Sequence, residues 1–303
     1  MNSLEPQSVA EVVAALSDHQ YLADEGLATS IFLAMRLHRP LLLEGEAGVG
    51  KTEVAKVLSR WTGGELIRLQ CYEGIDVSQA VYEWDYSHQL LHLKAAEVAG
   101  EVRGGADALE AGLYSERFLV RRALLRAIDH REGPPPVLLI DEIDRADDEF
   151  EAFLLEVLSD FTVTVPELGT FRALEPPIVI VTSNRTRDVH DALKRRCLYH
   201  WVEFPTFERE VEIVRVRAPD VSERLARQVA AAVEKLRELG PYKAPGVAET
   251  IDWAVSLATL GQVELTEANV SATLGTVLKY REDQEKARTA GLPEILRAAF
   301  ARG

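Results

Sequence analysis

The sequence predicts an α/β domain, built on a parallel sheet covered by helices, followed by a smaller all-helical domain. Its 303 residues are more than one hydrophobic core usually holds. Short apolar runs alternate with helical stretches in the first part of the chain, as in a parallel sheet with helices on both faces. After Pro205 only helical periodicity remains. We therefore predict an α/β core over residues 1–205 and a helical lid domain over 206–303.

Four apolar runs are predicted as buried strands, because each is short and is bounded by turn or polar residues. They are residues 40–44, 66–69, 137–140 and 178–182. Helical spacing marks residues 8–36 and, beyond Pro205, residues 208–217, 221–239, 247–260 and 266–281. Residues 100–112 are rich in glycine and alanine, which predicts an exposed excursion.

Composition narrows the class of partner and the compartment. Hydrophobic residues make up 47% and charged residues 27%, which is ordinary for a globular protein. The net charge of −15 argues against nucleic acid, because such a surface repels the phosphate backbone. We expect a cytoplasmic protein without a membrane span, since the chain has no basic, apolar leader and no run of about 20 apolar residues. Cys71 and Cys197 suit a reducing compartment and are predicted as buried apolar residues.

The first chemical motif, here called the P-loop, follows the first predicted strand and precedes a helix. Its residues fit G-x-x-x-x-G-K-[ST], and both flanks have the required character, so a chance glycine-rich turn is disfavoured. Backbone N–H groups of such a loop curl around a polyphosphate at a helix N-terminus. Lys51 is expected on the β- and γ-phosphates of ATP, and the Thr52 hydroxyl on Mg²⁺. The motif consists of Gly45, Glu46, Ala47, Gly48, Val49, Gly50, Lys51 and Thr52.

Two consecutive acids end the third predicted strand. Four apolar residues, 137–140, lead directly to Asp141 and Glu142, the pattern of a Walker B motif. Alone, such acids are better explained by capping of the next turn. Together with the P-loop they favour catalysis, with Asp141 in the Mg²⁺ shell and Glu142 orienting and deprotonating the attacking water.

Polar residues after the fourth predicted strand extend the site. Asn184 lies where ligands of open α/β sheets collect, which predicts a γ-phosphate sensor, although an isolated loop asparagine is equally ordinary. Further along, Arg195 and Arg196 end a short predicted helix. One of them is a candidate arginine finger, which a neighbouring subunit supplies in ring ATPases. The alternative is a solvated basic helix end favoured by the helix dipole.

Taken together, the P-loop, DEIDRA at 141–146, TSNR at 182–185 and the helical tail make the chain similar to the MoxR family of AAA+ ATPases. Asp144 stands where that family usually has asparagine. The resemblance implies a P-loop AAA+ core with a helical lid, ATP and Mg²⁺ as ligands, and an oligomeric ring, often a hexamer. It also implies maturation of a protein client, commonly with a von Willebrand factor A domain adaptor.

Three further stretches resemble the family. Residues 161–171 alternate as in the β-hairpin that this clade inserts before the sensor strand, with the turn expected around Gly169. Residues 193–205 and 245–254 resemble the branch associated with carbon monoxide dehydrogenase, which implies a molybdenum hydroxylase as client.

One departure from the family lies in the lid. Many members carry a second sensor arginine where this chain has residues 246–250, which contain no basic residue. Either another cation, such as Lys243 or Arg281, contacts the nucleotide, or the lid is coupled to it differently. Elsewhere, Tyr82, Trp84 and Tyr86 alternate with acids, which predicts one strand face, packed in the protein rather than open to a client.

Other classes of function compete with a remodelling ATPase. An ATP-gated assembly scaffold with negligible hydrolysis fits the missing lid arginine, and a magnesium-chelatase-like AAA+ subunit shares the motifs. A P-loop kinase or GTPase is disfavoured, because no N-K-x-D motif is present. A DNA-loading AAA+ protein is disfavoured by the acidic charge.

Overall fold

The computed structural model describes residues 5–99 and 112–302. These residues fall into two compact units, described separately here. The sheet unit lies within Met1–Ser8, Thr29–Leu43 and Leu58–His200, and the helical unit within Val9–Ala28, Glu44–Val57 and Trp201–Gly303. The domain boundary near Pro205 stays a prediction. The excursion predicted for residues 100–112 lies, except for Gly112, outside the described residues.

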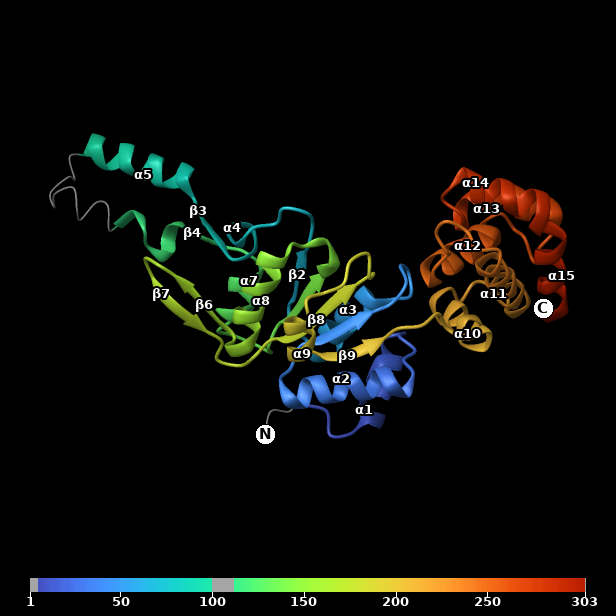
Figure 1. The fold of residues 1–303 in the computed structure, drawn as a ribbon, viewed down its shortest axis with the longest axis horizontal. Coiled ribbons are helices and arrows are strands. Elements are labelled where there is room, and N and C mark those ends of the chain that lie inside the picture. The colour runs from blue at the N-terminus through green and yellow to red at the C-terminus, as the bar shows by residue number, and fades with distance from the viewer. Residues whose placement is uncertain (1–4, 100–111, 303) are drawn as a thin grey trace. The chain divides into compact units, whose positions relative to one another are not determined.

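A five-stranded parallel sheet forms the centre of the sheet unit, as predicted (Figure 1). All four predicted strands are present, and an edge strand, β9, was not predicted because its four residues form a short, mixed pattern. The register pairs Gln70 with Asp141 on neighbouring strands. In order across the sheet, the strands are β2 (Leu66–Gln70), β5 (Val137–Asp141), β8 (Ile178–Ser183), β1 (Leu41–Glu44) and β9 (Leu198–Trp201).

Helices and two small antiparallel pairs complete this unit. The buried core runs from Leu42 through β2, β5 and β8 to the helices packed on them. The Asp147 carboxylate starts α8 by accepting from Phe150 N at 2.8 Å. The helices are α2 (Glu25–Leu37), α3 (Lys51–Thr62), α4 (Val77–Ala80), α5 (Tyr86–Ala99), α7 (Ala123–Ile128), α8 (Asp148–Asp160) and α9 (Asp191–Arg196), and α2 and α3 extend into the helical unit.

The two antiparallel pairs test two sequence predictions. The hairpin of β6 (Thr162–Val165) and β7 (Gly169–Arg172) is confirmed, with its turn just before Gly169. The other pair joins β3 (Tyr82–Trp84) to β4 (Leu119–Arg121). The prediction of three aromatics on one strand was wrong for Tyr86, which begins α5 and is exposed, while Trp84 is buried against Tyr82 and Tyr114.

The helical unit has its own apolar core, in which Trp253 is fully buried. Predicted helices 208–217, 221–239 and 247–260 are confirmed within two residues at each end. The helix predicted over 266–281 ends at Val277, and the helices beyond it were not predicted. The unit comprises α1 (Val9–Asp18), α10 (Phe207–Arg217), α11 (Glu223–Glu238), α12 (Val247–Thr259), α13 (Glu267–Val277), α14 (Arg281–Lys286), a π-helical segment (Ala287–Gly291) and α15 (Leu292–Arg302).

Within residues 5–99 and 112–302, no helix combines the length and the apolar character needed to cross a bilayer.

Candidate functional site

The P-loop takes the conformation that its glycines permit. Gly48 and Gly50 have φ angles of 82° and 101°, a region that side-chain-bearing residues rarely adopt. The Lys51 ammonium lies against the loop, 2.7 Å from the carbonyl oxygens of Gly45 and of Glu46. Helix α3 begins at Lys51, so the P-loop leads directly into the backbone amides of the helix N-terminus. This is the local geometry of an anion-binding loop.

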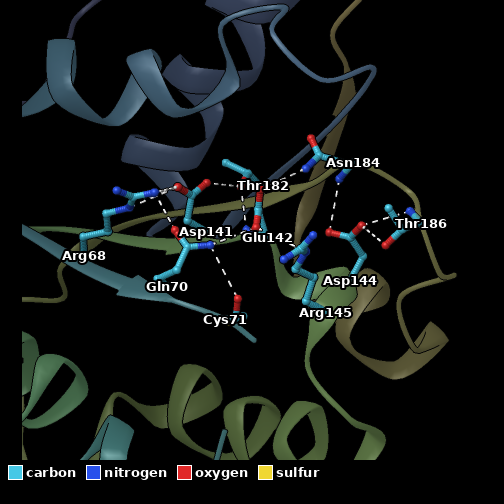
Figure 2. Close-up of polar contacts among 10 residues, drawn as sticks. All are labelled: Arg68, Gln70, Cys71, Asp141, Glu142, Asp144, Arg145, Thr182, Asn184 and Thr186. Atoms are coloured by element: carbon cyan, nitrogen blue, oxygen red, sulfur yellow. Dashed lines mark hydrogen bonds and ion pairs between the residues drawn. The ribbon is translucent and has the colours of Figure 1, made fainter. Parts of the chain in front are cut away.

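At the end of β5, Asp141 is almost completely buried and both of its carboxylate oxygens accept hydrogen bonds (Figure 2). Oδ1 accepts from the Thr182 hydroxyl at 2.5 Å. Oδ2 accepts from Arg68, at 3.1 Å from Nε and 2.5 Å from Nη2. These contacts fix the orientation of the carboxylate at the end of the strand.

Glu142, the next residue, has a left-handed backbone with φ 56° and ψ 51°. This conformation ends the strand abruptly and turns the chain into a short 3₁₀ turn, η2 (Ile143–Arg145). The turn is held by the Thr182 hydroxyl, which accepts from Glu142 N at 3.0 Å while it donates to Asp141. One threonine on β8 therefore orients both acids of the motif.

The Glu142 carboxylate lies among polar side chains from three segments (Figure 2). Asn184 Nδ2 donates to its Oε1 at 3.3 Å, and Gln70 Nε2 donates to its Oε2 at 3.0 Å. Arg145 Nε lies 3.4 Å from the same Oε2. The structure thus brings together Asp141, Glu142 and Asn184, which the sequence predicted as parts of one site.

Asp144, which stands where MoxR proteins usually have asparagine, holds the neighbouring loop in place. Its buried carboxylate accepts from Asn184 N at 3.2 Å, Thr186 N at 2.9 Å and Thr186 Oγ1 at 2.6 Å. These bonds anchor the loop that presents the Asn184 amide. An asparagine has only one acceptor oxygen and could not accept from donors on both of its terminal atoms.

Arg68, Gln70 and Thr182 also belong to this cluster, although the sequence did not predict them as site residues. Arg68 and Gln70 lie two residues apart on β2 and therefore share one face of that strand. Register supplies the missing information, because it places Gln70 opposite Asp141. The available signal was a pair of polar residues, two apart, on a short strand that is otherwise apolar.

Both cysteines are buried free thiols, as predicted. Burial raises the pKa of the Cys71 thiol to about 12, with the nearby Asp141 carboxylate adding to the shift. Burial also raises the pKa of Cys197 to about 12. Both sulfurs are therefore protonated at neutral pH, which suits packing rather than nucleophilic chemistry.

Arg195 and Arg196 end α9 with exposed side chains. The Arg39 guanidinium caps this helix by donating to the carbonyl oxygens of Arg195 at 2.9 Å and of Arg196 at 3.0 Å. The backbone of the arginine pair is thus fixed while both guanidinium groups stay open to solvent. That arrangement is compatible with a finger offered to another subunit and also with a solvated helix end.

Within the helical unit, the start of the lid helix α12 touches the P-loop. Val247 N donates to Gly48 O at 2.9 Å. A Cβ added to Gly246 would lie 2.5 Å from Gly48 Cα, so only glycine allows this approach. The lid therefore contacts the phosphate-binding loop through backbone atoms.

Thr250, near the position where many MoxR proteins have a second sensor arginine, is fully buried and faces a buried ion pair. Its hydroxyl donates to Glu210 Oε1 at 2.6 Å. Arg237 donates to both oxygens of Glu210, at 2.7 Å each, and through Nε to Pro245 O at 2.8 Å. The ion pair therefore supports the backbone just before Gly246. Of the two replacement cations suggested by the sequence, Lys243 is exposed and Arg281 pairs with Glu285.

Gly246→Ala is expected to destabilise the chain by about 1–3 kcal/mol, because the added methyl group overlaps the Gly48 backbone. ATP affinity should fall as well, since the P-loop must shift to make room. Urea unfolding and nucleotide titration measure the two effects. Gly275→Ala is the matched control: its Cβ would meet its nearest atom, in Gln284, at 3.6 Å, and alanine favours a helix interior. If Gly246→Ala and Gly275→Ala had the same stability and the same ATP affinity, the close contact between Gly246 and Gly48 would be contradicted.

Comparisons with known proteins agree with this geometry. Residues 40–197, just over half of the chain, match the family model described as AAA domain (dynein-related subfamily). The "ATP-dependent Clp protease ATP-binding subunit ClpE" of Lactococcus lactis subsp. lactis (strain IL1403) is 27% identical over 150 residues, which is 48% of this chain and 17% of that protein. The "Chaperone protein ClpB" of Chlamydia trachomatis serovar D is 29% identical over 167 residues, 54% of this chain and 16% of that protein.

These matches span only about a sixth of the length of the curated relatives. Among solved structures, the Thermotoga maritima RuvB Holliday junction branch migration motor has a TM-score of 0.46 at 16% identity, covering 89% of this chain and 72% of that one. The P-loop, the paired acids after β5 and Asn184 all lie inside the matched region. The chain therefore belongs to the AAA domain family, dynein-related subfamily, and is an AAA+ ATPase.

Proposed function

We propose that the chain is a MoxR-type remodelling ATPase that works as a homo-oligomeric ring on a protein client. The observation that carries the proposal is the placement of the Glu142 carboxylate, held by Gln70 and Asn184 one residue beyond the buried Asp141. A carboxylate placed one residue beyond the metal ligand suits the base that activates water at the γ-phosphate, and the two amides hold it until nucleotide binds. A structural turn would not need amide donors on both of its oxygens.

In this proposal the P-loop and the β5 acids serve one nucleotide. Their strands, β1 and β5, belong to the same parallel sheet with β8 between them, and carboxyl ends of parallel strands meet at one edge. Lys51 binds the β- and γ-phosphates, the loop amides bind the remaining phosphate oxygens, and Asn184 contacts the γ-phosphate. Glu142 orients the attacking water and accepts its proton.

Mg²⁺ fits the donor set of these residues. The Asp141 carboxylate and the Thr52 hydroxyl are hard oxygen ligands, and Mg²⁺ prefers one or two such protein ligands with phosphate oxygens and water. When bound, the ion neutralises charge that develops on the phosphates. The hydrogen bonds from Thr182 and Arg68 fix the Asp141 carboxylate in position at the end of β5, where a cation bound to the phosphates would meet it.

A neighbouring subunit is proposed to complete each site with Arg195 or Arg196. On the sheet unit, a hollow of ≈ 960 Å³ at the turn after β5 is lined by five acidic residues and by two arginines, Arg145 and Arg187, so acids predominate. The basic end of α9 from another copy complements it in charge. The acids of this hollow are Glu73, Asp144, Asp147, Asp148 and Glu149.

Mixing two inactive variants tests the shared site. Glu142→Gln subunits lack the base and Arg196→Ala subunits lack the finger, so each alone should hydrolyse little ATP. In a mixed ring, some interfaces pair an intact base with an intact finger, and partial turnover should return. Phosphate release against mixing ratio measures it. Parallel mixing with Arg195→Ala identifies which arginine serves. Failure of both mixtures to recover activity would contradict a shared site.

The client can be identified with the same base variant. Glu142→Gln should bind ATP without hydrolysing it and so retain a client, which mass spectrometry then names. We propose a molybdenum hydroxylase as client and a von Willebrand factor A domain protein as adaptor, on the resemblance of residues 193–205 and 245–254 to that branch. Steady-state phosphate release by the unmodified chain excludes the scaffold alternative, and its absence would support it.

A further inference from the structure

The Asp141 carboxylate already carries a positive partner. Arg68 donates two hydrogen bonds to its Oδ2, from Nε at 3.1 Å and Nη2 at 2.5 Å, while Thr182 occupies Oδ1 (Figure 2). The pair is asymmetric in its surroundings: the Asp141 side chain is 4% exposed and the Arg68 side chain 54%. The acid is fixed in the protein, whereas the arginine reaches it from the solvent side.

A guanidinium on Oδ2 competes with a metal ion for the same oxygen. Two cations that close to one carboxylate repel each other, and the repulsion is greatest where little water screens them. Because Arg68 is exposed, its departure replaces an ion pair by hydration of the guanidinium at small cost. Departure of Asp141 is prevented by its burial and by its bond to Thr182.

Arg68 is also connected to the predicted base. Its Nη2 donates to Gln70 Oε1 at 2.5 Å, and Gln70 Nε2 donates to Glu142 Oε2 at 3.0 Å. The Gln70 amide is therefore held at both ends, by Arg68 through its oxygen and by Glu142 through its nitrogen. If Arg68 leaves, the amide loses one of these restraints and can rotate away from Glu142.

We propose that Arg68 is a latch: it pairs with Asp141 until that carboxylate binds the nucleotide's metal ion, and its release then frees Gln70 and Glu142 for hydrolysis. This rests on the proposed function, since it assumes that Asp141 serves the metal. Arg68 is a positioning residue that acts through Gln70. The arrangement keeps the base restrained while the metal and nucleotide are absent. The alternative is a permanent ion pair that orients Asp141 and assists metal binding.

The two arrangements predict opposite changes in metal coupling. The measured quantity is the factor by which Mn²⁺ tightens binding of AMP-PNP, a non-hydrolysable ATP analogue, compared with binding in EDTA, both by calorimetry. Removing a competing guanidinium should increase this factor in Arg68→Gln by about two- to fivefold, the range expected for one exposed ion pair. Arg126→Gln is the matched control: Arg126 is similarly exposed but pairs with Glu65 outside this cluster, so the factor should not change.

The possible outcomes distinguish failure of the latch from failure of the proposed ATPase function. A factor that is unchanged or reduced in Arg68→Gln, with normal metal-dependent binding in the unmodified chain, overturns the latch alone. Failure of the unmodified chain to bind AMP-PNP in either condition overturns the proposed function and the latch together. Thermal melting of each variant verifies that the chain is folded. Arg68→Lys keeps the positive charge but loses the paired donors, so its metal-dependent factor should lie between those of the unmodified chain and Arg68→Gln.

A crystal structure of the unmodified chain with Mn²⁺ and AMP-PNP tests the same idea by distance. The latch requires Arg68 Nη2 to lie beyond about 4 Å, the usual limit of an ion pair, from Asp141 Oδ2. It also requires the 3.0 Å bond between Gln70 and Glu142 to lengthen. An Arg68–Asp141 contact that persists with the metal bound would refute the proposal.

Discussion

Glu142→Gln is expected to lower kcat for ATP hydrolysis by about 10²–10⁴, the usual contribution of a positioned base, with ATP affinity retained. Glutamine has the shape of glutamate and keeps one acceptor oxygen for Gln70 or Asn184, but it cannot take a proton from water. The P-loop, which carries most phosphate contacts in the proposal, is unchanged. Steady-state phosphate release and equilibrium ATP titration measure the two quantities.

Glu156→Gln is the matched control for this variant. Glu156 is an exposed acid on α8, so the substitution makes the same change in charge away from the cluster. Its kcat should equal that of the unmodified chain. Hydrolysis at an unmodified rate in Glu142→Gln would remove Glu142 from the mechanism and favour another acid near the γ-phosphate.

Arg237→Ala is expected to destabilise the helical unit by about 3–5 kcal/mol, because it leaves the Glu210 carboxylate buried without its cation. The Glu210 side chain is 1% exposed and that of Arg237 13%, and the two form a bidentate pair. The variant also removes the donor to Pro245 O. Urea unfolding followed by fluorescence should report the loss, since Trp253 lies in the core of this unit.

Arg281→Ala is the control here, because Arg281 pairs with Glu285 on the surface of α14 and such pairs contribute about 0.2–1 kcal/mol. The double variant Glu210→Gln/Arg237→Met should recover much of the loss, since it removes both charges together. If Arg237→Ala unfolds at the same urea concentration as Arg281→Ala, the buried pair does not stabilise the unit.

Most of the α/β architecture could be predicted because its strands are continuous apolar runs. Residues 137–140 and 178–182 are uniformly apolar or β-branched, which is how a strand buried on both faces differs from a surface element. The P-loop and the acids after β5 were found for a related reason, since their chemistry depends on neighbours in the chain. Asp141 and Glu142 are recognised by the strand that they end.

Contacts between distant segments could not be read in this way. Arg68 precedes Asp141 by 73 positions, and only the pairing of β2 with β5 shows that they meet. From the sequence, the lack of a basic residue at 246–250 suggested only that a second sensor arginine was missing. The structure shows that Thr250 instead makes a buried hydrogen bond to Glu210. The edge strand β9 and the break after Val277 were missed because short, mixed patterns do not separate strand from loop, or one helix from two.

The left-handed backbone of Glu142 has a cost for the whole protein. A residue with a side chain in this region is disfavoured by about 1–2 kcal/mol, and glycine is not. Glycine at this position would relax the turn but remove the carboxylate, so the best residue for folding and the best for hydrolysis differ. Laboratory selection for heat resistance alone would therefore be expected to erode turnover at this position, unless the selection also required ATP to be consumed.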